Sequence, residues 1–266
     1  MRLAIIGSGK MATALVLGIV EEDVLSDTDI IASDINEDAR RSFEKKTGIR
    51  CVASSAEALK GADVVLLAVK PQSAKDLIPE ISKLCNGKLI ISIMAGITLS
   101  KLCGWFGTKR VVRTMPNTPL MVGKGATAFT CGEDVSTADK ELTKSFFKAS
   151  GIVFELPESN LDIVTALSGS GPAFAFEYIQ AMVDAAEKSG LKKEIALELA
   201  VQTLAGAAEM LKQKMGTPDE LRNAVTSKGG TTAAGLAVLE KANFRELVRE
   251  VILAAENRSK ELGKAE

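Results

Sequence analysis

The chain has 266 residues, of which 46% are hydrophobic and 25% charged, with a formal net charge of −1 and no histidine. This balance gives no electrostatic basis for binding nucleic acid or an anionic membrane, and no apolar run approaches the length of a membrane span. Without histidine the chain lacks the commonest general acid–base group and the commonest transition-metal ligand, so we expect no metal site.

The first part of the chain alternates short apolar runs with helical patterns. Strands are expected at 2–7, 29–34, 50–53, 63–71, 88–96, 110–116, 125–132 and 151–156, and helices at 10–21, 37–47, 54–61, 72–85 and 137–149. Continuous apolar strands separated by helices predict a mostly parallel sheet covered on both faces. The expected fold class is α/β, with an N-terminal Rossmann domain followed by an all-α C-terminal domain.

From about residue 158 the strand-like runs end. Helices are expected at 172–189, 192–214, 218–225, 232–241 and 243–262, rich in alanine, leucine and glutamate. We therefore place a dinucleotide-binding domain at 1–158 and a helical dimerisation and substrate domain at 159–266. The helices carry wide apolar faces that a domain of this size cannot bury by itself, which predicts contact with a second subunit.

The N-terminal segment "AIIGSGKMATAL" (4–15) places Gly7, Gly9 and Ala12 between a strand and a helix, in the G-x-G-x-x-A arrangement. In this context the first glycine makes the tight turn, the second admits the pyrophosphate, and the helix N-terminus attracts its charge. We assign Gly7, Ser8, Gly9, Lys10 and Met11 to a cofactor site. The alternative is a glycine turn used only for packing.

Asp34 ends the second expected strand, where a carboxylate usually accepts hydrogen bonds from the ribose of the adenosine. Such a carboxylate repels a 2′-phosphate, so the cofactor is NADPH or NADH with NADH favoured. Arg40 and Arg41 follow on a helix and could still reach a phosphate. The alternative role for Asp34 is a turn or helix-capping residue.

The ends of the fourth and fifth strands complete the expected cofactor site, since ligands of open α/β sheets bind at the carboxyl ends of the strands. The residues assigned there are Ala68, Val69, Lys70, Pro71, Ala95 and Gly96. Lys70 is either a catalytic lysine or a residue whose loop backbone matters more than its amine. The four cysteines have apolar flanks and no C-x-x-C spacing, which favours buried free thiols.

Five segments resemble the pyrroline-5-carboxylate reductase family over the whole length of the chain. They are "IGSGKMATAL" (6–15), "AVKPQ" (68–72), "RTMPNTP" (113–119), "ALSGSGPAF" (166–174) and "VTSKGGTTAAGL" (225–236). Two features depart from the family pattern. Lys228 stands where many members have proline, and Asp34 is acidic where members that prefer NADPH carry small, polar or basic residues.

The resemblance implies hydride transfer from NAD(P)H to the cyclic imine carbon of L-1-pyrroline-5-carboxylate, giving L-proline. It also implies a homodimer through the C-terminal helices, with further assembly into decamers. A protonated cyclic imine accepts hydride without a protein acid, which suits a chain without histidine. The remaining partner is then the small-molecule imine itself, with no nucleic acid and no membrane, and because the N-terminus shows no signal-peptide pattern we expect a cytoplasmic enzyme.

The segment "TSKGGTTAAG" (226–235) is expected to bind the substrate carboxylate. Its two glycines permit a tight backbone nest, a threonine can cap the next helix, and the amides of 230–232 supply donors. The substrate residues are Ser227, Gly229, Gly230, Thr231 and Thr232. The resemblance also implies that the Thr232 hydroxyl bonds the ring nitrogen, which makes Thr232 the one candidate catalytic residue. The alternative is an ordinary helix N-terminus after a glycine-rich loop.

The segment "LSGSGPAF" (167–174) leads into a long helix with a proline in its first turn, and either borders the same pocket or is only a kink between domains. Two other classes stay open on the residues alone. A β-hydroxyacid dehydrogenase would need a lysine early on this helix, whose first lysine, Lys188, lies near its far end. A non-catalytic NAD(P)-binding oligomer would need no carboxylate-binding segment.

Overall fold

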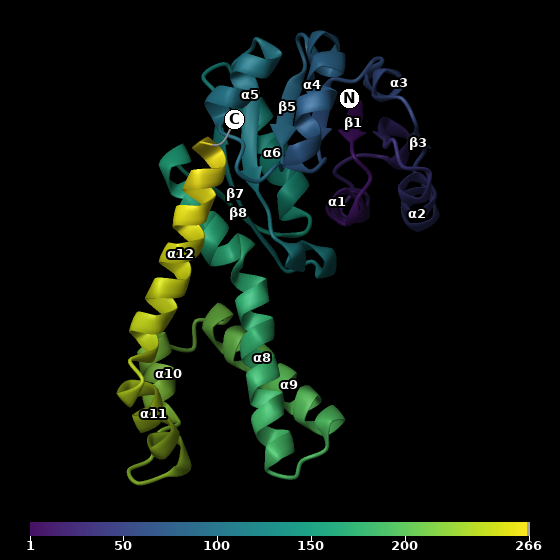
Figure 1. Cartoon of the computed structure of the whole chain (residues 1–266). Helices are drawn as coiled ribbons and strands as arrows, with labels where there is room; N and C mark the ends of the chain where they lie inside the picture. Colours follow the sequence, from purple (N-terminus) through teal and green to yellow (C-terminus); the bar gives the residue numbers. More distant parts are fainter. Residues whose placement is uncertain (265–266) are drawn as a thin grey trace. The chain divides into compact units, whose positions relative to one another are not determined.

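The computed structural model describes residues 1–264, which form two compact units (Figure 1). The first unit contains residues 1–170 and the chain from Ala254 onward, and the second contains Gly171–Leu253. The long C-terminal helix begins in the second unit and ends in the first.

The first unit is built on one eight-stranded sheet in the order β3-β2-β1-β4-β5-β6-β7-β8. The strands are β1 (Leu3–Ile6), β2 (Ile30–Ser33), β3 (Cys51–Val52), β4 (Val64–Leu67), β5 (Leu89–Ser92), β6 (Val111–Met115), β7 (Gly125–Cys131) and β8 (Gly151–Glu155). All neighbouring pairs are parallel except β6 and β7. The last two strands therefore run opposite to the first six.

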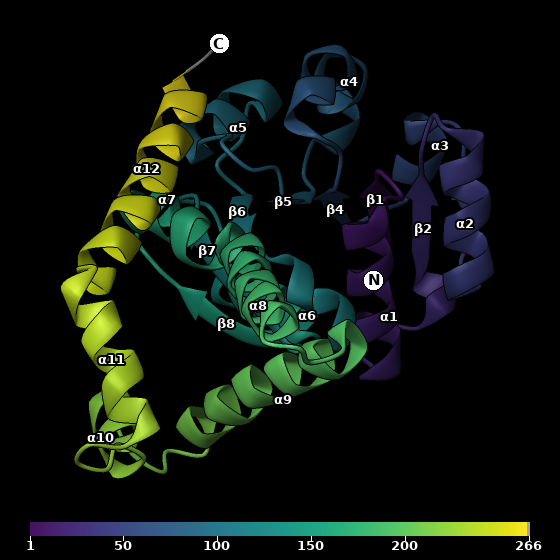
Figure 2. The same ribbon diagram turned by 60° about the horizontal axis from the view of Figure 1, so that its bottom comes forward.

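Helices cover both faces of this sheet. They are α1 (Lys10–Glu21), α2 (Glu37–Thr47), α3 (Ser55–Leu59), α4 (Ala74–Ile81), α5 (Leu99–Phe106), α6 (Thr137–Lys148) and the single turn α7 (Leu161–Val164). Because side chains alternate along a strand, Leu3 and Ile5 enter the core under α1 and α6, whereas Ala4 and Ile6 enter the core under α3, α4 and α5. Figure 2 shows α4 and α5 on one side of the strands and α1 and α6 on the other.

The strand order positions the cofactor site. Strand β1 lies between β2 and β4, so the chain leaves β1 in one direction across the sheet and returns to its other side for β4. In open α/β sheets this reversal opens a crevice at the carboxyl ends of the strands. The glycine turn after β1 and the loop after β4 both lie at that reversal.

The second unit is entirely helical among the described residues. It contains α8 (Gly171–Lys188), α9 (Lys193–Lys212), α10 (Pro218–Ala224), α11 (Thr231–Lys241) and the first part of α12 (Phe244–Lys264). Helices α8 and α9 pack around a small core of Val183, Ala196 and Ala200. Large apolar side chains such as Phe176 and Val238 each remain 66% exposed. The described part of this unit thus presents much more apolar surface than it buries.

The predicted fold class is confirmed, and the long helices lie within a few residues of their expected bounds. Several short elements were missed, among them α5, the single turn α7 and a π-helical turn. Helix α5 follows the loop after β5, capped by Thr98, whose hydroxyl accepts the N–H of Lys101. A π-helical turn, Thr165–Gly169, follows α7 and precedes α8. Across residues 1–264, no helix combines the length and the apolar content that crossing a membrane requires.

The four cysteines are free thiols, and the prediction that they are buried holds for two of them. Cys51 and Cys85 are buried, whereas Cys103 and Cys131 are partly exposed. Burial raises the pKa of Cys85 and of Cys131 to about 11. These thiols are therefore protonated at neutral pH and unsuited to nucleophilic chemistry.

Candidate active site

The first glycine of the turn after β1 is required by geometry. Gly7 has φ of +102° and donates its N–H to the carbonyl of Ser33 at 2.8 Å. A Cβ atom at this position would lie 2.7 Å from the carbonyl oxygen of Ala68, in the loop after β4. Only glycine avoids both the backbone strain and the collision. Gly7 therefore lets the turn after β1 pack directly against the loop after β4.

The second glycine leaves space for a ligand. Gly9 is the N-cap of α1, and a Cβ atom on it would meet no described protein atom within 4 Å. The N–H of Thr13 makes the first helical hydrogen bond, to Gly9, so the amides of Lys10, Met11 and Ala12 are the free N-terminal donors of the helix. The side chain of Lys10 is exposed, and that of Met11 packs against the core. The turn therefore offers amides, an open approach and the positive end of a helix dipole.

Asp34 clamps the glycine turn. One carboxylate oxygen accepts the N–H of Ser8 at 2.9 Å and its hydroxyl at 3.2 Å, and the other accepts the N–H of Asn36 at 2.9 Å. Ser8 is buried beneath the turn. Asp34 therefore does act as a turn residue. Its carboxylate is half-buried at the rim of the crevice and can accept one further hydrogen bond.

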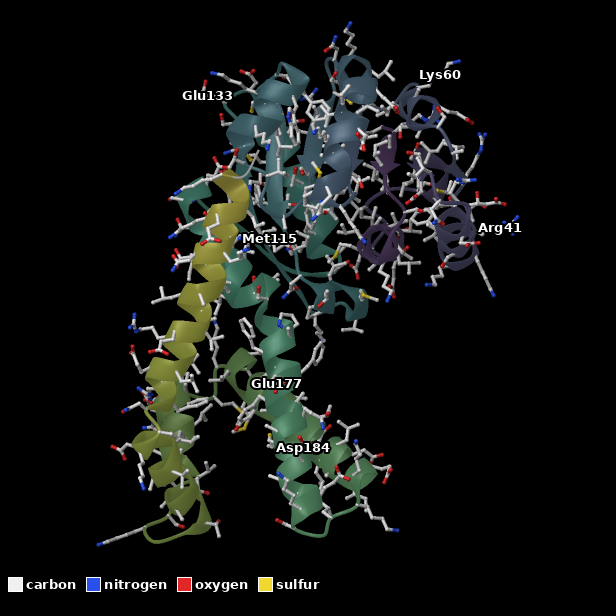
Figure 3. All side chains as sticks on the ribbon, in the orientation of Figure 1. Arg41, Lys60, Met115, Glu133, Glu177 and Asp184 are labelled. Atoms are coloured by element: carbon white, nitrogen blue, oxygen red, sulfur yellow. The ribbon has the colours of Figure 1, made fainter. Side chains whose placement is uncertain are left out.

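The two arginines after Asp34 have different surroundings. The guanidinium of Arg40 donates to the carbonyls of Asp34 and Ile35 at 2.9 and 3.1 Å, which holds it against the end of β2. Arg41 forms an ion pair with Glu37 on the exposed side of α2 and points into solvent (Figure 3). Arg40 is therefore the one of the two that lies beside the crevice.

A cavity of about 590 Å³ brings half of the predicted cofactor residues together at the carboxyl ends of β1, β2 and β4. Its walls include Gly7, Gly9, Asp34, Ala68, Val69 and Lys70. Lys70 is exposed at the rim, so its amine lacks the burial by which a protein activates a catalytic lysine. The cavity also has walls that the sequence did not indicate, from Ser54 and Ser55 at the start of α3 and from Leu77 and Glu80 on α4.

The remaining predicted cofactor residues lie outside the described lining of this cavity. Pro71 begins the turn that leads into α4. Ala95 is exposed and Gly96 has φ of +75°, both in the loop between β5 and α5. This loop follows the strand next to β4, so it stands further along the same edge of the sheet.

The segment "RTMPNTP" contains Asn117, whose hydrogen bonds the sequence alone did not indicate. Asn117 accepts the N–H of Ala126 at 2.8 Å and donates to the carbonyl of Ser168 at 3.0 Å. It therefore ties the start of β7 to the π-helical turn before α8. A Cβ atom on Gly169 would lie 2.4 Å from the Met115 methyl group, so this turn closes tightly over the end of β6 (Figure 3).

The predicted substrate segment is a glycine turn followed by the N-terminus of α11, in the second unit. Gly229 has φ of +72°, and a Cβ atom on Gly230 would lie 2.3 Å from the hydroxyl oxygen of Ser227. The helix is capped by Gly230, not by a threonine, and Thr231 and Thr232 are its first two residues. The expectation that a threonine caps this helix is therefore wrong.

One amide of the expected donor set is already used. The N–H of Gly230 donates to the carbonyl of Ser227 at 3.0 Å, which closes the turn. The first helical bond runs from Ala234 to Gly230, so the free N-terminal amides belong to Thr231, Thr232 and Ala233. The donor group is thus displaced by one residue from the amides of 230–232 that the sequence suggested.

The residues present fit a dinucleotide. Open space beside Gly9, free amides at the start of α1 and a carboxylate at the end of β2 are the features that a pyrophosphate and a ribose require. Among the residues the structure describes, no three His, Cys, Asp or Glu side chains gather as metal ligands.

The fold and this cavity define a nicotinamide-dinucleotide-dependent oxidoreductase of the Rossmann type. The pyrroline-5-carboxylate reductase of Pseudomonas aeruginosa is 42% identical over 98% of this chain and 96% of its own length. The chain belongs to the pyrroline-5-carboxylate reductase family.

Further comparisons agree along the whole chain. Residues 158–262 match the family model described as pyrroline-5-carboxylate reductase dimerisation, and residues 2–96 match that of NADP oxidoreductase, coenzyme F420-dependent. The solved reductase of Coxiella burnetii is 37% identical, covers 99% of both chains and gives a TM-score of 0.92. The Plasmodium falciparum enzyme, solved with NADP bound, is 32% identical over 99% of this chain and 98% of its own, with a TM-score of 0.90.

Proposed function

We propose that the protein reduces L-1-pyrroline-5-carboxylate to L-proline, the last step of proline biosynthesis, with NAD(P)H as the hydride donor. The observation that carries the proposal is that one member of this family combines a cavity suited to a dinucleotide with a glycine turn and free amides at the N-terminus of α11. A dinucleotide-binding protein without this reaction would not need the second feature.

The reaction does not require a protein side chain to donate a proton. NAD(P)H, when bound, supplies the hydride that adds to the imine carbon. A protonated cyclic imine accepts it directly, and the product amine keeps the proton. The chain, which has no histidine, then has to bind, orient and desolvate the substrate.

The substrate carboxylate is bound, in this proposal, at the N-terminus of α11. Ser227, Gly229 and Gly230 shape the turn, and the amides of Thr231 and Thr232 donate to the carboxylate at the positive end of the helix dipole. The Thr232 hydroxyl bonds the ring nitrogen, which places Thr232 in the catalytic role. It orients the ring and is too weak an acid to supply a proton.

The cofactor half of the proposal assigns the pyrophosphate to Gly7–Met11 and the nicotinamide to the loops that contain Val69 and Ala95. Asp34 favours NADH, because its carboxylate repels a 2′-phosphate and has capacity for a ribose hydroxyl. Arg40 lies beside the same rim but donates to two backbone carbonyls.

The assembly we propose is a homodimer through the C-terminal helices, which associates further into decamers, in the cytoplasm. Its support is the exposed apolar surface of α8, α9 and α11 and the dimerisation model that matches residues 158–262. That model begins at the boundary we propose between a dinucleotide-binding domain, 1–158, and a helical domain, 159–266.

The test is a steady-state assay of pyrroline-5-carboxylate reduction with NADH and NADPH in parallel, with and without a metal chelator. We expect turnover that a chelator does not slow. Gly230→Val should raise the KM for the imine sharply, since its side chain collides with Ser227, while nucleotide binding stays unchanged. Folded protein that oxidises neither nucleotide in the presence of the imine would disprove the proposed activity.

A further inference from the structure

The loop between β5 and α5 has a fixed backbone with one exposed residue. Met94 is 2% exposed and Ile97 is buried with it in the core that α5 covers. The hydroxyl of Ser92 accepts the N–H of Met94 at 3.2 Å, which holds the start of the loop. Ala95 lies exposed between the two buried side chains. The loop therefore presents a small residue from a rigid backbone at the edge of the sheet where the cofactor site lies.

Glu158 holds the far end of this loop. Its Oε1 atom accepts the N–H of Leu99, the first residue of α5, at 2.6 Å, and also accepts Nη1 of Arg113 at 2.8 Å. Arg113 stands on β6, and its side chain is only 7% exposed. One carboxylate oxygen thus connects β6, the end of the loop and the chain segment that follows β8.

Stability alone does not explain this arrangement. Arg113 is buried and Glu158 is half-buried, and such a pair adds little net stability, because the loss of hydration offsets most of the attraction. Apolar side chains would join β6 to the same segment equally well. They could not accept the N–H of Leu99, and they would not interact with the positive end of α5 as the carboxylate of Glu158 does. The contact with Leu99 is therefore the property that requires a carboxylate here.

The last turns of α12 reach the same loop from the other end of the chain. A Cβ atom on Gly96 would lie 3.4 Å from the Cβ atom of Leu262, and one on Gly263 would lie 3.5 Å from the Gly96 carbonyl oxygen. The hydroxyl of Ser259 donates to Asp162 on α7 at 2.7 Å, which fixes the helix there. Figures 1 and 2 both show the end of α12 beside α5.

We propose that Glu158 is a positioning residue for hydride transfer: supported by Arg113, it fixes the β5–α5 loop against which the nicotinamide half of the cofactor rests. This inference depends on the proposed placement of Ala95 and Gly96 at the nicotinamide. The residues at both limits of the segment 158–262, which matches the dimerisation model, therefore contact the β5–α5 loop or its end.

The test compares two nucleotides that differ at the nicotinamide. NADH carries it and ADP-ribose lacks it, while the adenosine, pyrophosphate and second ribose are shared. Glu158→Ala should weaken NADH binding, measured by calorimetry, by about tenfold and leave ADP-ribose binding unchanged, since the charge-assisted hydrogen bond that holds Leu99 and the loop is lost. Glu158→Gln keeps an acceptor for Leu99 and should bind NADH nearly as wild type does. The kcat for imine reduction should follow NADH affinity, with the KM for the imine unchanged.

A matched control is the ion pair at the other end of β6. Arg110 donates two hydrogen bonds to the buried carboxylate of Asp139, at 3.0 and 2.8 Å. Asp139→Asn weakens that pair far from the loop and should leave the affinity for both nucleotides unchanged. If Glu158→Ala leaves Arg113 buried, charged and unpaired and so prevents folding, the double variant Arg113→Met/Glu158→Ala removes both charges and gives the same comparison.

Two results separate failure of this inference from failure of the cofactor site. If folded Glu158→Ala, or the double variant, loses NADH and ADP-ribose binding equally, or loses neither, the positioning role is refuted. If the wild type binds neither nucleotide, the proposed cofactor site itself is wrong.

Discussion

Replacement of Asp34 by serine tests how the end of β2 selects the cofactor. The carboxylate accepts three hydrogen bonds, from the N–H and hydroxyl of Ser8 and from the N–H of Asn36, at 2.9, 3.2 and 2.9 Å. Serine is shorter and neutral, so it cannot bridge both loops at once. The variant therefore loses the negative charge at the rim and the clamp on the glycine turn together.

The two losses should affect nucleotide affinity and cofactor preference differently. Loss of the clamp loosens the turn for any nucleotide, and one charge-assisted hydrogen bond of about 1.5 kcal/mol predicts a common fall in affinity of about tenfold. Loss of the charge removes repulsion of a 2′-phosphate and a ribose acceptor. That difference is worth about 1–3 kcal/mol, so the ratio of kcat/KM for NADH to that for NADPH should fall by about 5- to 150-fold.

The measurement is kcat/KM for each nucleotide at saturating imine, with nucleotide affinity measured separately. Ser8→Ala is the matched control, since it removes one of the three bonds at Asp34 and leaves the charge in place. It should lower both affinities slightly and keep the NADH to NADPH ratio. If wild-type protein prefers NADPH several-fold, or if Asp34→Ser lowers both values and leaves their ratio unchanged, Asp34 is only a clamp and the reasoning on selectivity is wrong.

Three further outcomes are expected. Gly7→Ala should abolish nucleotide binding and lower the melting temperature, because its Cβ atom would lie 2.7 Å from the carbonyl oxygen of Ala68; wild-type affinity would contradict this. Thr232→Ala should lower kcat about tenfold with nucleotide affinity unchanged, and an unaltered kcat would remove Thr232 from the catalytic role. The Arg110 guanidinium holds the pKa of Asp139 below its ordinary value of 3.8, so the stability it contributes is present above that pH and lost as pH falls through the lower, folded-state pKa. The free energy of unfolding in urea should therefore differ most between Asp139→Asn and wild type near neutral pH, and the two values should converge in acid. A difference that stays constant with pH would show that the charge is not responsible.

The sequence predicted those parts of the site that depend on neighbours in the chain. Gly7 and Gly9 follow a strand and open a helix, and that local context sufficed to predict a tight turn with free amides. Strand β4 was predicted in the same way, from an apolar run that stops at a proline, although the strand ends at Leu67, four residues before the expected end at Pro71. Each of these signals lies within about ten residues.

Features that depend on distant segments were not predicted. The bond between Arg113 and Glu158 spans 45 positions of the sequence, and neither residue has a periodic or motif context that indicates a partner. The role of Asn117 depends on Ser168, 51 positions away. Helix α5 was missed for a related reason: its segment "LSKLCGWF" (99–106) is short and contains a glycine, so its helical conformation depends on the Thr98 cap and on packing over the sheet.

The helical region shows how an apolar pattern can be informative without identifying a site. Alanine- and leucine-rich helices predicted surface that the chain cannot bury alone, and the second unit buries only a small described core around Val183 while Phe176 and Val238 stay largely exposed. Apolar surface of this extent is unfavourable in water, so a partner must cover it for the unit to be stable. Helix α12 begins in this second unit, and its end, in the first unit, contacts the β5–α5 loop. In the proposed arrangement α12 therefore links assembly to cofactor binding, and a substitution that loosens this helix should affect both.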